Sequence, residues 1–120
     1  KTKNFPGFYL TDSGFEIEYQ ADTADQIASA IKARASMKTN SSALIVANPV
    51  KNQMDKKLHD SILASGLANA EKEGITGKAV TPFLLEHFHT ASDGDSLRVN
   101  IEIIKSNSAL AADIAVALNK

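Results

Sequence analysis

Asn100 is the residue whose position in the sequence most needs a chemical explanation. It lies in the stretch SLRVNIEIIKSNSALAADIAVAL, residues 96–118, which has the periodicity of one long amphipathic helix. At about 100° per residue, Asn100 falls near the centre of the apolar part, on the azimuth of Leu118 and between Ile103 and Ile104. A carboxamide buried without partners costs about 1–3 kcal/mol. Backbone, water or a ligand must therefore satisfy it.

The two faces of this helix are otherwise cleanly separated. The polar arc consists of Lys105, Arg98, Ala109, Glu102 and Asp113. The apolar part consists of Leu97, Ile101, Ile103, Ile104, Leu110, Ile114 and Leu118. Asn100 is the polar exception within the second set.

Other candidate groups have simpler interpretations. His87 and His89 are two residues apart on an expected helix, about 200° from each other, so they cannot chelate one metal ion from a regular helix. We expect surface or helix-end roles for both. Asp93-Gly94-Asp95 lacks the remaining ligands of a calcium loop, and acidic residues at a helix N-terminus explain it better.

Asp12-Ser13-Gly14 is not a nucleophile elbow, because the Gly-x-Ser-x-Gly frame is absent. The pattern predicts a turn, in which the Ser13 hydroxyl could also contact a ligand. No paired carboxylates, glycine-rich phosphate loop or Ser/His/Asp arrangement can be argued from spacing. The residues by themselves show no metal site.

Composition narrows the class of protein. The chain has 120 residues, enough for about one domain with a small core. With 13 basic and 14 acidic residues interspersed, it gives no electrostatic case for nucleic acid or an anionic membrane as partner. It has no cysteine and no apolar run near the roughly 20 residues that span a bilayer. The Asn40-Ser41-Ser42 sequon is discounted, because no secretory signal precedes the first element.

Turn and cap signals divide the chain into elements. Residues 1–14 are expected to be a loop, and residues 15–20 alternate as a half-buried strand. Residues 22–37 form a helix opened by a Thr23/Gln26 capping box. Its expected buried positions are Ile27, Ala28, Ile31 and Ala35.

The second half adds one strand and three helices. Residues 42–49, SALIVANP, suit a strand that is covered on both faces. A helix over 54–74 is stopped by Gly74, with Leu58, Ile62 and Leu67 buried. Thr81 as N-cap and Pro82 begin a short helix, and the long helix follows. The order β-α-β-α-α-α predicts an α/β layered sheet with flanking helices over residues 15–120, part of a larger sheet because two strands cannot support four helices.

Four motifs, in this order, resemble the C-terminal third of the pseudouridine-5′-phosphate glycosidase family. They are FPGFYLTDSGF, ALIVANPV, GITGKAVTPFLL and the long-helix stretch quoted above. The resemblance runs from Phe5 to Leu118 and implies the C-terminal segment of a larger α/β/α domain. The chain departs from the family pattern at Leu10-Thr11, where Thr-Arg is common, and at Ser106-Asn107, where Asn-Asn is common.

The resemblance implies an activity, the reversible cleavage of pseudouridine 5′-phosphate to uracil and ribose 5-phosphate. Carbon is a poor leaving group, so the family uses a lysine that forms an imine, which serves as an electron sink. A glutamate moves protons, and a manganese ion held through an aspartate assists. All three residues lie upstream of the part that this chain resembles, so we expect the chain alone to be inactive. The resemblance also implies a cytoplasmic homotrimer.

Asn100 is the one site residue that the resemblance carries over. The family has an asparagine at this step of the last helix, and it is expected to approach the bound nucleotide. The alternative is a carboxamide bonded to a loop carbonyl in the core. For the chain as a whole, the alternative is a non-catalytic α/β interaction module that retains only the family's packing.

Overall fold

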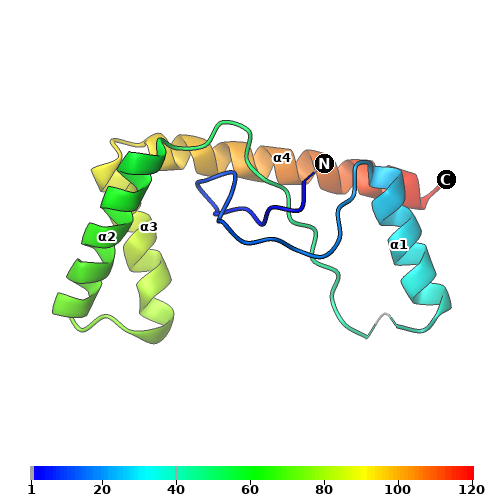
Figure 1. Ribbon diagram of the computed structural model, residues 1–120, viewed down its shortest axis with the longest axis horizontal. Coiled ribbons are helices and arrows are strands. Elements are labelled where there is room, and N and C mark those ends of the chain that lie inside the picture. Colours follow the sequence, from blue (N-terminus) through cyan, green and yellow to red (C-terminus); the bar gives the residue numbers. More distant parts are fainter. Residues whose placement is uncertain (1, 40) are drawn as a thin grey trace.

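Helix α4, of 24 residues, runs along the length of the molecule, and the other helices project from its two ends (Figure 1). The computed structural model describes residues 2–39 and 41–120, so Lys1 and the sequon residue Asn40 lie outside the described residues. The helices in the described part are α1 (Ala24–Ser36), α2 (Lys56–Lys72), α3 (Val80–Ala91) and α4 (Asp95–Leu118), with a 3₁₀ turn η1 (Gly77–Ala79) before α3.

The molecule is elongated, measuring 51 × 28 × 22 Å. The α2–α3 pair lies at one end of α4 and α1 at the other end, with the loop segments between them (Figure 1). Gly66 allows α2 and α3 to approach closely, because a Cβ at this position would lie 2.8 Å from a ring carbon of His87. None of the described helices is long and apolar enough to cross a lipid bilayer.

Two helix ends follow local signals, as expected. The Thr23 side chain accepts from the Gln26 backbone, and the Gln26 side chain accepts from the Thr23 backbone, so the capping box is confirmed. Helix α2 ends before Gly74, which has a φ of +67° that favours glycine. Both signals act within a few residues, which is why the sequence alone reveals them.

The predicted N-cap of α3 is wrong. The helix begins at Val80 with Ala79 as its N-cap, so Thr81 lies inside the first turn and makes no cap hydrogen bond. The reason is η1, which leads the chain into α3 already in a helical conformation. Pro82 is still tolerated there, because the N–H groups of a first turn have no intrahelical partner.

The expected buried positions are confirmed only in part. Ile27, Ala28 and Ile62 are buried. Ala35, Leu58 and Leu67 were expected to be buried but are exposed. Helices α1 and α2 each pack against one neighbouring helix, so the sides of their apolar stripes away from that helix stay open.

Neither expected strand forms within the described residues. The only bridge recorded there joins Asn4 and Glu16, and residues 42–49 have neither regular secondary structure nor strand pairing. A strand needs a neighbour for its backbone groups, and no described segment supplies one to residues 42–49. The layered sheet of the sequence analysis is therefore not confirmed.

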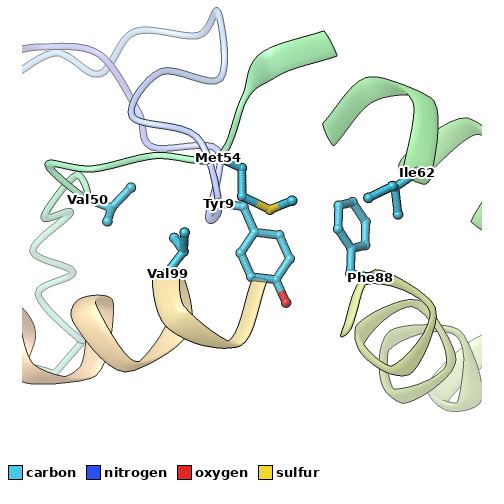
Figure 2. Close-up of a cluster of buried hydrophobic side chains, with 6 residues drawn as sticks. All are labelled: Tyr9, Val50, Met54, Ile62, Phe88 and Val99. Carbon is cyan, nitrogen blue, oxygen red and sulfur yellow. The ribbon is translucent and has the colours of Figure 1, made fainter. Parts of the chain in front are cut away.

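The core lies where the N-terminal loop, the segment before α2, and helices α2, α3 and α4 meet (Figure 2). Its members are Tyr9, Val50, Met54, Ile62, Phe88 and Val99. The Tyr9 and Phe88 rings are 5.0 Å apart between centroids, and the Met54 backbone N–H donates to the Tyr9 carbonyl at 3.0 Å. Residues far apart in sequence thus share one small core.

We expect the isolated chain to associate through its exposed apolar surface. Large side chains such as Phe15, Tyr19 and Ile45 are 74–83% exposed. We expect the apolar surface that they expose to exceed what monomers usually show. Sedimentation of the purified chain should give species larger than the monomer, and a hydrophobic dye should fluoresce with it. A monodisperse monomer that binds no dye would contradict this expectation.

Candidate functional site

A groove between α3 and the start of α4 contains Asn100. Its volume is about 280 Å³. Its polar lining is Tyr9, Glu86, His89, Ser96 and Asn100, and its apolar lining is Pro82, Leu85 and Leu97. A mainly apolar groove with a few convergent polar groups is the usual form of a small-molecule site.

The Asn100 carboxamide has no hydrogen-bond partner among the described residues. The residue is half-buried, and its side chain makes no hydrogen bond to any residue in the described part of the chain. No carbonyl of the described loops accepts from it, and whether Asn100 contacts a ligand or the core stays a prediction. Two donors and one acceptor remain available in the groove.

The expectation that Asn100 occupies the driest part of α4 is wrong. Val99 is the buried centre, at 0% exposure, while Leu97 and Ile101 beside Asn100 are 48% and 45% exposed. The apolar sector of α4 is wider than the surface that the loop and α3 cover. Packing therefore buries one edge of the apolar sector of α4, at Val99, and Asn100 lies on its more exposed side.

Tyr9 and Ser96 form the buried floor of the groove. Both are almost fully buried, and the Ser96 hydroxyl lies beside the phenol. Burial raises the pKa of Tyr9, and the hydrogen bond from Ser96 offsets only part of that rise. The phenol keeps its proton at physiological pH, as an ordinary tyrosine does, and can act as a hydrogen-bond donor. Sequence reasoning missed both residues, and no local pattern marks them.

The start of α4 positions Ser96 and Asn100. The Ser92 side chain accepts from the Ser96 backbone N–H at 3.0 Å, and Gly94 takes a φ of +83° as N-cap. Asp95 lies in the first turn and pairs with Arg98 at 2.7 Å. The interpretation of the acidic residues as a helix N-terminus is confirmed for Asp95.

The two histidines have separate environments. His87 lies 2.8 Å from the Ser65 hydroxyl, a contact that joins α3 to α2, and it stacks on Phe83 of its own helix. His89 lies at the end of α3 and lines the groove. The expected helix-end role fits His89, whereas His87 is half-buried inside α3 and packs against α2, so the expectation is wrong for His87. His89 is the one that the structure brings to Asn100.

Asp12-Ser13-Gly14 is a turn, as expected. Asp12 Oδ1 accepts from the Gly14 backbone at 2.8 Å, and Ser13 Oγ donates to the Phe5 carbonyl at 2.7 Å. A ligand contact for Ser13 stays a prediction. The unusual Thr11 donates through Oγ1 to the Val50 carbonyl at 2.8 Å, so it fastens the loop to the core.

A second groove, of about 670 Å³, follows the polar arc of α4. Lys51, Arg98, Glu102 and Lys105 supply its charges. Hydrogen bonds from Asn52 hold the pKa of the Glu102 carboxyl below its usual range, and they fasten the segment before α2 to α4. Glu102 and Arg98 in this groove already bind Asn52 and Asp95 of the protein, so it is a weaker candidate for a ligand site.

A manganese site does not fit the described residues. They contain no group of three or more His, Asp or Glu side chains placed to hold a metal ion. The metal that the resemblance implies would have to be held by residues outside this set.

Comparison with solved structures identifies the fold. The structure is similar to part of the prealnumycin C-glycosynthase AlnA, solved in complex with ribulose 5-phosphate. The TM-score is 0.84 at 22% sequence identity, over 98% of this chain and 39% of that one. At this identity the likeness shows the fold alone, and the chain has the fold of one segment of that longer protein.

Sequence comparison then gives the family. The family model described as indigoidine synthase A like protein matches residues 1–117, and the chain belongs to this family. A relative from Salinispora tropica is 53% identical over 119 residues, and one from Saccharopolyspora erythraea is 43% identical over 120 residues. Both are named pseudouridine-5′-phosphate glycosidase. The matches cover 98% of this chain but only 37% and 39% of those proteins.

Tyr9→Phe should change the alkaline stability of the chain. Because the folded-state pKa is raised, the phenol keeps its proton at a pH where the unfolded chain has lost it, from about 10 upward. The contribution of Tyr9 to stability is therefore complete below pH of about 10 and is lost as pH rises through the folded-state pKa. As pH rises through this range, the unfolding temperature of Tyr9→Phe should fall less steeply than that of the parent chain.

Tyr19→Phe is the matched control, since Tyr19 is 83% exposed. It should leave the profile of the parent chain unchanged, whereas Tyr9→Phe should also lose about 0.5–1.5 kcal/mol at neutral pH. Identical profiles for the two variants would show that the Tyr9 phenol is not held neutral by the fold.

Proposed function

We propose that this chain is the C-terminal part of a pseudouridine-5′-phosphate glycosidase and forms one wall of its substrate pocket. The unpartnered carboxamide of Asn100 in the groove carries the proposal. The relatives named for this activity support it, at up to 53% identity. The fold-level neighbour, solved with ribulose 5-phosphate, is in keeping with a sugar phosphate as ligand.

Asn100 would recognise the substrate by hydrogen bonding. Its carboxamide can donate twice and accept once, which matches the edge of uracil or a sugar hydroxyl. The neutral Tyr9 phenol, partly engaged by Ser96, lies in the same groove. Apolar Leu85 and Leu97 would exclude water from one side.

The bond-breaking chemistry would come from residues outside this chain. In the proposed enzyme these are a lysine that forms an imine with the opened sugar, a glutamate that moves protons, and an aspartate that holds manganese. The manganese, the homotrimeric assembly and the cytoplasmic location belong to the proposal in the same way. This chain contributes binding and orientation.

A second candidate is a non-catalytic interaction module. The exposed apolar side chains favour it, because a surface of this kind needs a partner. The two candidates differ in whether the groove binds a nucleotide once the rest of the domain is present.

The chain alone should not cleave pseudouridine 5′-phosphate, with or without manganese. A chimera in which its 120 residues replace the matching 37% of the Salinispora tropica protein should release uracil. Uracil release can be followed by its absorbance after chromatography. Turnover by the isolated chain would refute the division of roles, and a folded but inactive chimera would favour the interaction module.

Asn100→Ala in this chimera should reduce kcat/KM with little loss of stability. One neutral hydrogen bond to a ligand is worth about 0.5–1.5 kcal/mol, or up to about tenfold. Asn100→Leu should be at least as stable as the parent and still catalytically poor, because it adds apolar area beside Ile104. Both effects follow from a carboxamide without a protein partner.

Asn119→Ala provides the control, because Asn119 lies at the end of α4 and donates to the Ala115 carbonyl. It should turn over substrate like the parent chimera. An Asn100→Ala variant that unfolds early but retains full turnover below its unfolding temperature would place Asn100 in the core.

A further inference from the structure

The charged groove along the polar arc of α4 has walls from two distant parts of the sequence. One wall is α4, and the other is the segment before α2, which is bound to α4 at two points. Asn48 Nδ2 donates to Ser106 Oγ and Asn107 Oδ1, both at 3.0 Å. Asn52 donates through its backbone N–H and Nδ2 to Glu102 Oε1, both at 3.1 Å. These bonds hold together the two walls of a groove of about 670 Å³.

The carboxylate and the guanidinium of this groove are already used within the protein. Glu102 accepts from Asn52, and Arg98 Nη1 lies 3.7 Å from Glu102 Oε2. Arg98 Nε also pairs with Asp95 at 2.7 Å. Neither side chain therefore decides what else the groove can bind, which depends on the polar groups that remain.

The polar side chains that remain offer donors. Lys51 and Lys105 make no side-chain hydrogen bond or ion pair with any residue that the structure describes. The Ser106 hydroxyl accepts from Asn48, and its proton has no acceptor among the same residues. An ammonium group has three donors and no acceptor. A ligand that satisfies these groups must supply acceptors, and the two positive charges favour an anion.

We propose that this groove binds the phosphate group of a small molecule, held by Lys51 on one wall and by Lys105 and Ser106 on the other. Phosphate oxygens are strong acceptors, and lysine binds them as a point charge. Nucleic acid is a poorer ligand, because the 13 basic residues of the chain are balanced by 14 acidic ones.

The proposed site lies on the opposite side of α4 from Asn100. At about 100° per residue, Arg98 and Lys105 lie about 160° and 140° from Asn100 around the helix axis. The two grooves share no lining residue. An α-helix with its side chains is about 10–12 Å across, so α4 separates this phosphate from a ligand at Asn100. The proposal therefore concerns a second molecule and does not depend on the proposed function.

Equilibrium dialysis of the purified chain against radiolabelled inorganic phosphate, at constant ionic strength, tests this. Dialysis is suitable even if the chain associates. Phosphate should bind saturably, and Lys51→Gln and Lys105→Gln should each weaken binding about two- to fivefold, as is usual for solvated ion pairs. The double variant should weaken it about tenfold, since the two lysines act from different walls. Binding that rises linearly without saturation would overturn the proposal.

The matched control is the double variant Lys57→Gln/Lys78→Gln. It removes the same charge from two exposed lysines that do not line the groove, so it should bind phosphate like the parent chain. Lys105→Arg should also retain binding, because it keeps the positive charge. Equal losses in the two double variants would show that only the net charge matters, and this result would overturn the proposal.

Competition identifies the ligand. Uridine, which has no phosphate, should not displace the labelled ion, and displacement by uridine would overturn the proposal. Ribose 5-phosphate should displace it. Displacement at lower concentrations than unlabelled phosphate requires would support a phosphate ester as the ligand, and displacement at equal concentrations would support the free ion. An inactive chimera would refute the proposed function without changing any of these results.

Discussion

Burial of Tyr9 is the interaction on which the other parts of this structure depend. The N-terminal loop has no regular secondary structure, yet it inserts this ring between Met54, Phe88 and the start of α4 (Figure 2). The loop, the segment before α2, the α2–α3 pair and α4 are thereby joined in one core. Without this ring, α2 and α3 would keep only a limited contact with α4, since their main packing is with each other.

The same ring links stability to the candidate site. The Tyr9 hydroxyl forms part of the floor of the groove beside Ser96, while its aromatic face packs in the core. The packing that holds the chain together therefore also places the Tyr9 side chain in the groove that Asn100 lines. The Tyr9 side chain therefore belongs both to the hydrophobic core and to the candidate site.

The exposed apolar surface and the unpaired backbone of residues 43–49 have a common physical cause. Both are groups whose partners in a complete sheet would come from distant sequence, and the described residues do not provide them. Helices remain formed under these conditions, because each satisfies its own backbone. A strand cannot, which explains why the helices are present and the expected sheet is not.

The sequence alone determined the local features: the Thr23/Gln26 capping box, the end of α2 before Gly74, the acidic first turn at Asp95, and Asn100 as an unusual polar residue. Each depends on hydrogen bonds or periodicity within a few residues. Tertiary structure decided which edge of α4 is buried, so that Val99 and not Asn100 is the least exposed residue. It brought Tyr9 and Ser96 to the groove. It also decided that residues 42–49 stay unpaired and that Asn48 and Asn52 bind α4. These outcomes depend on contacts across many intervening residues, and such contacts leave no periodic signal in the sequence.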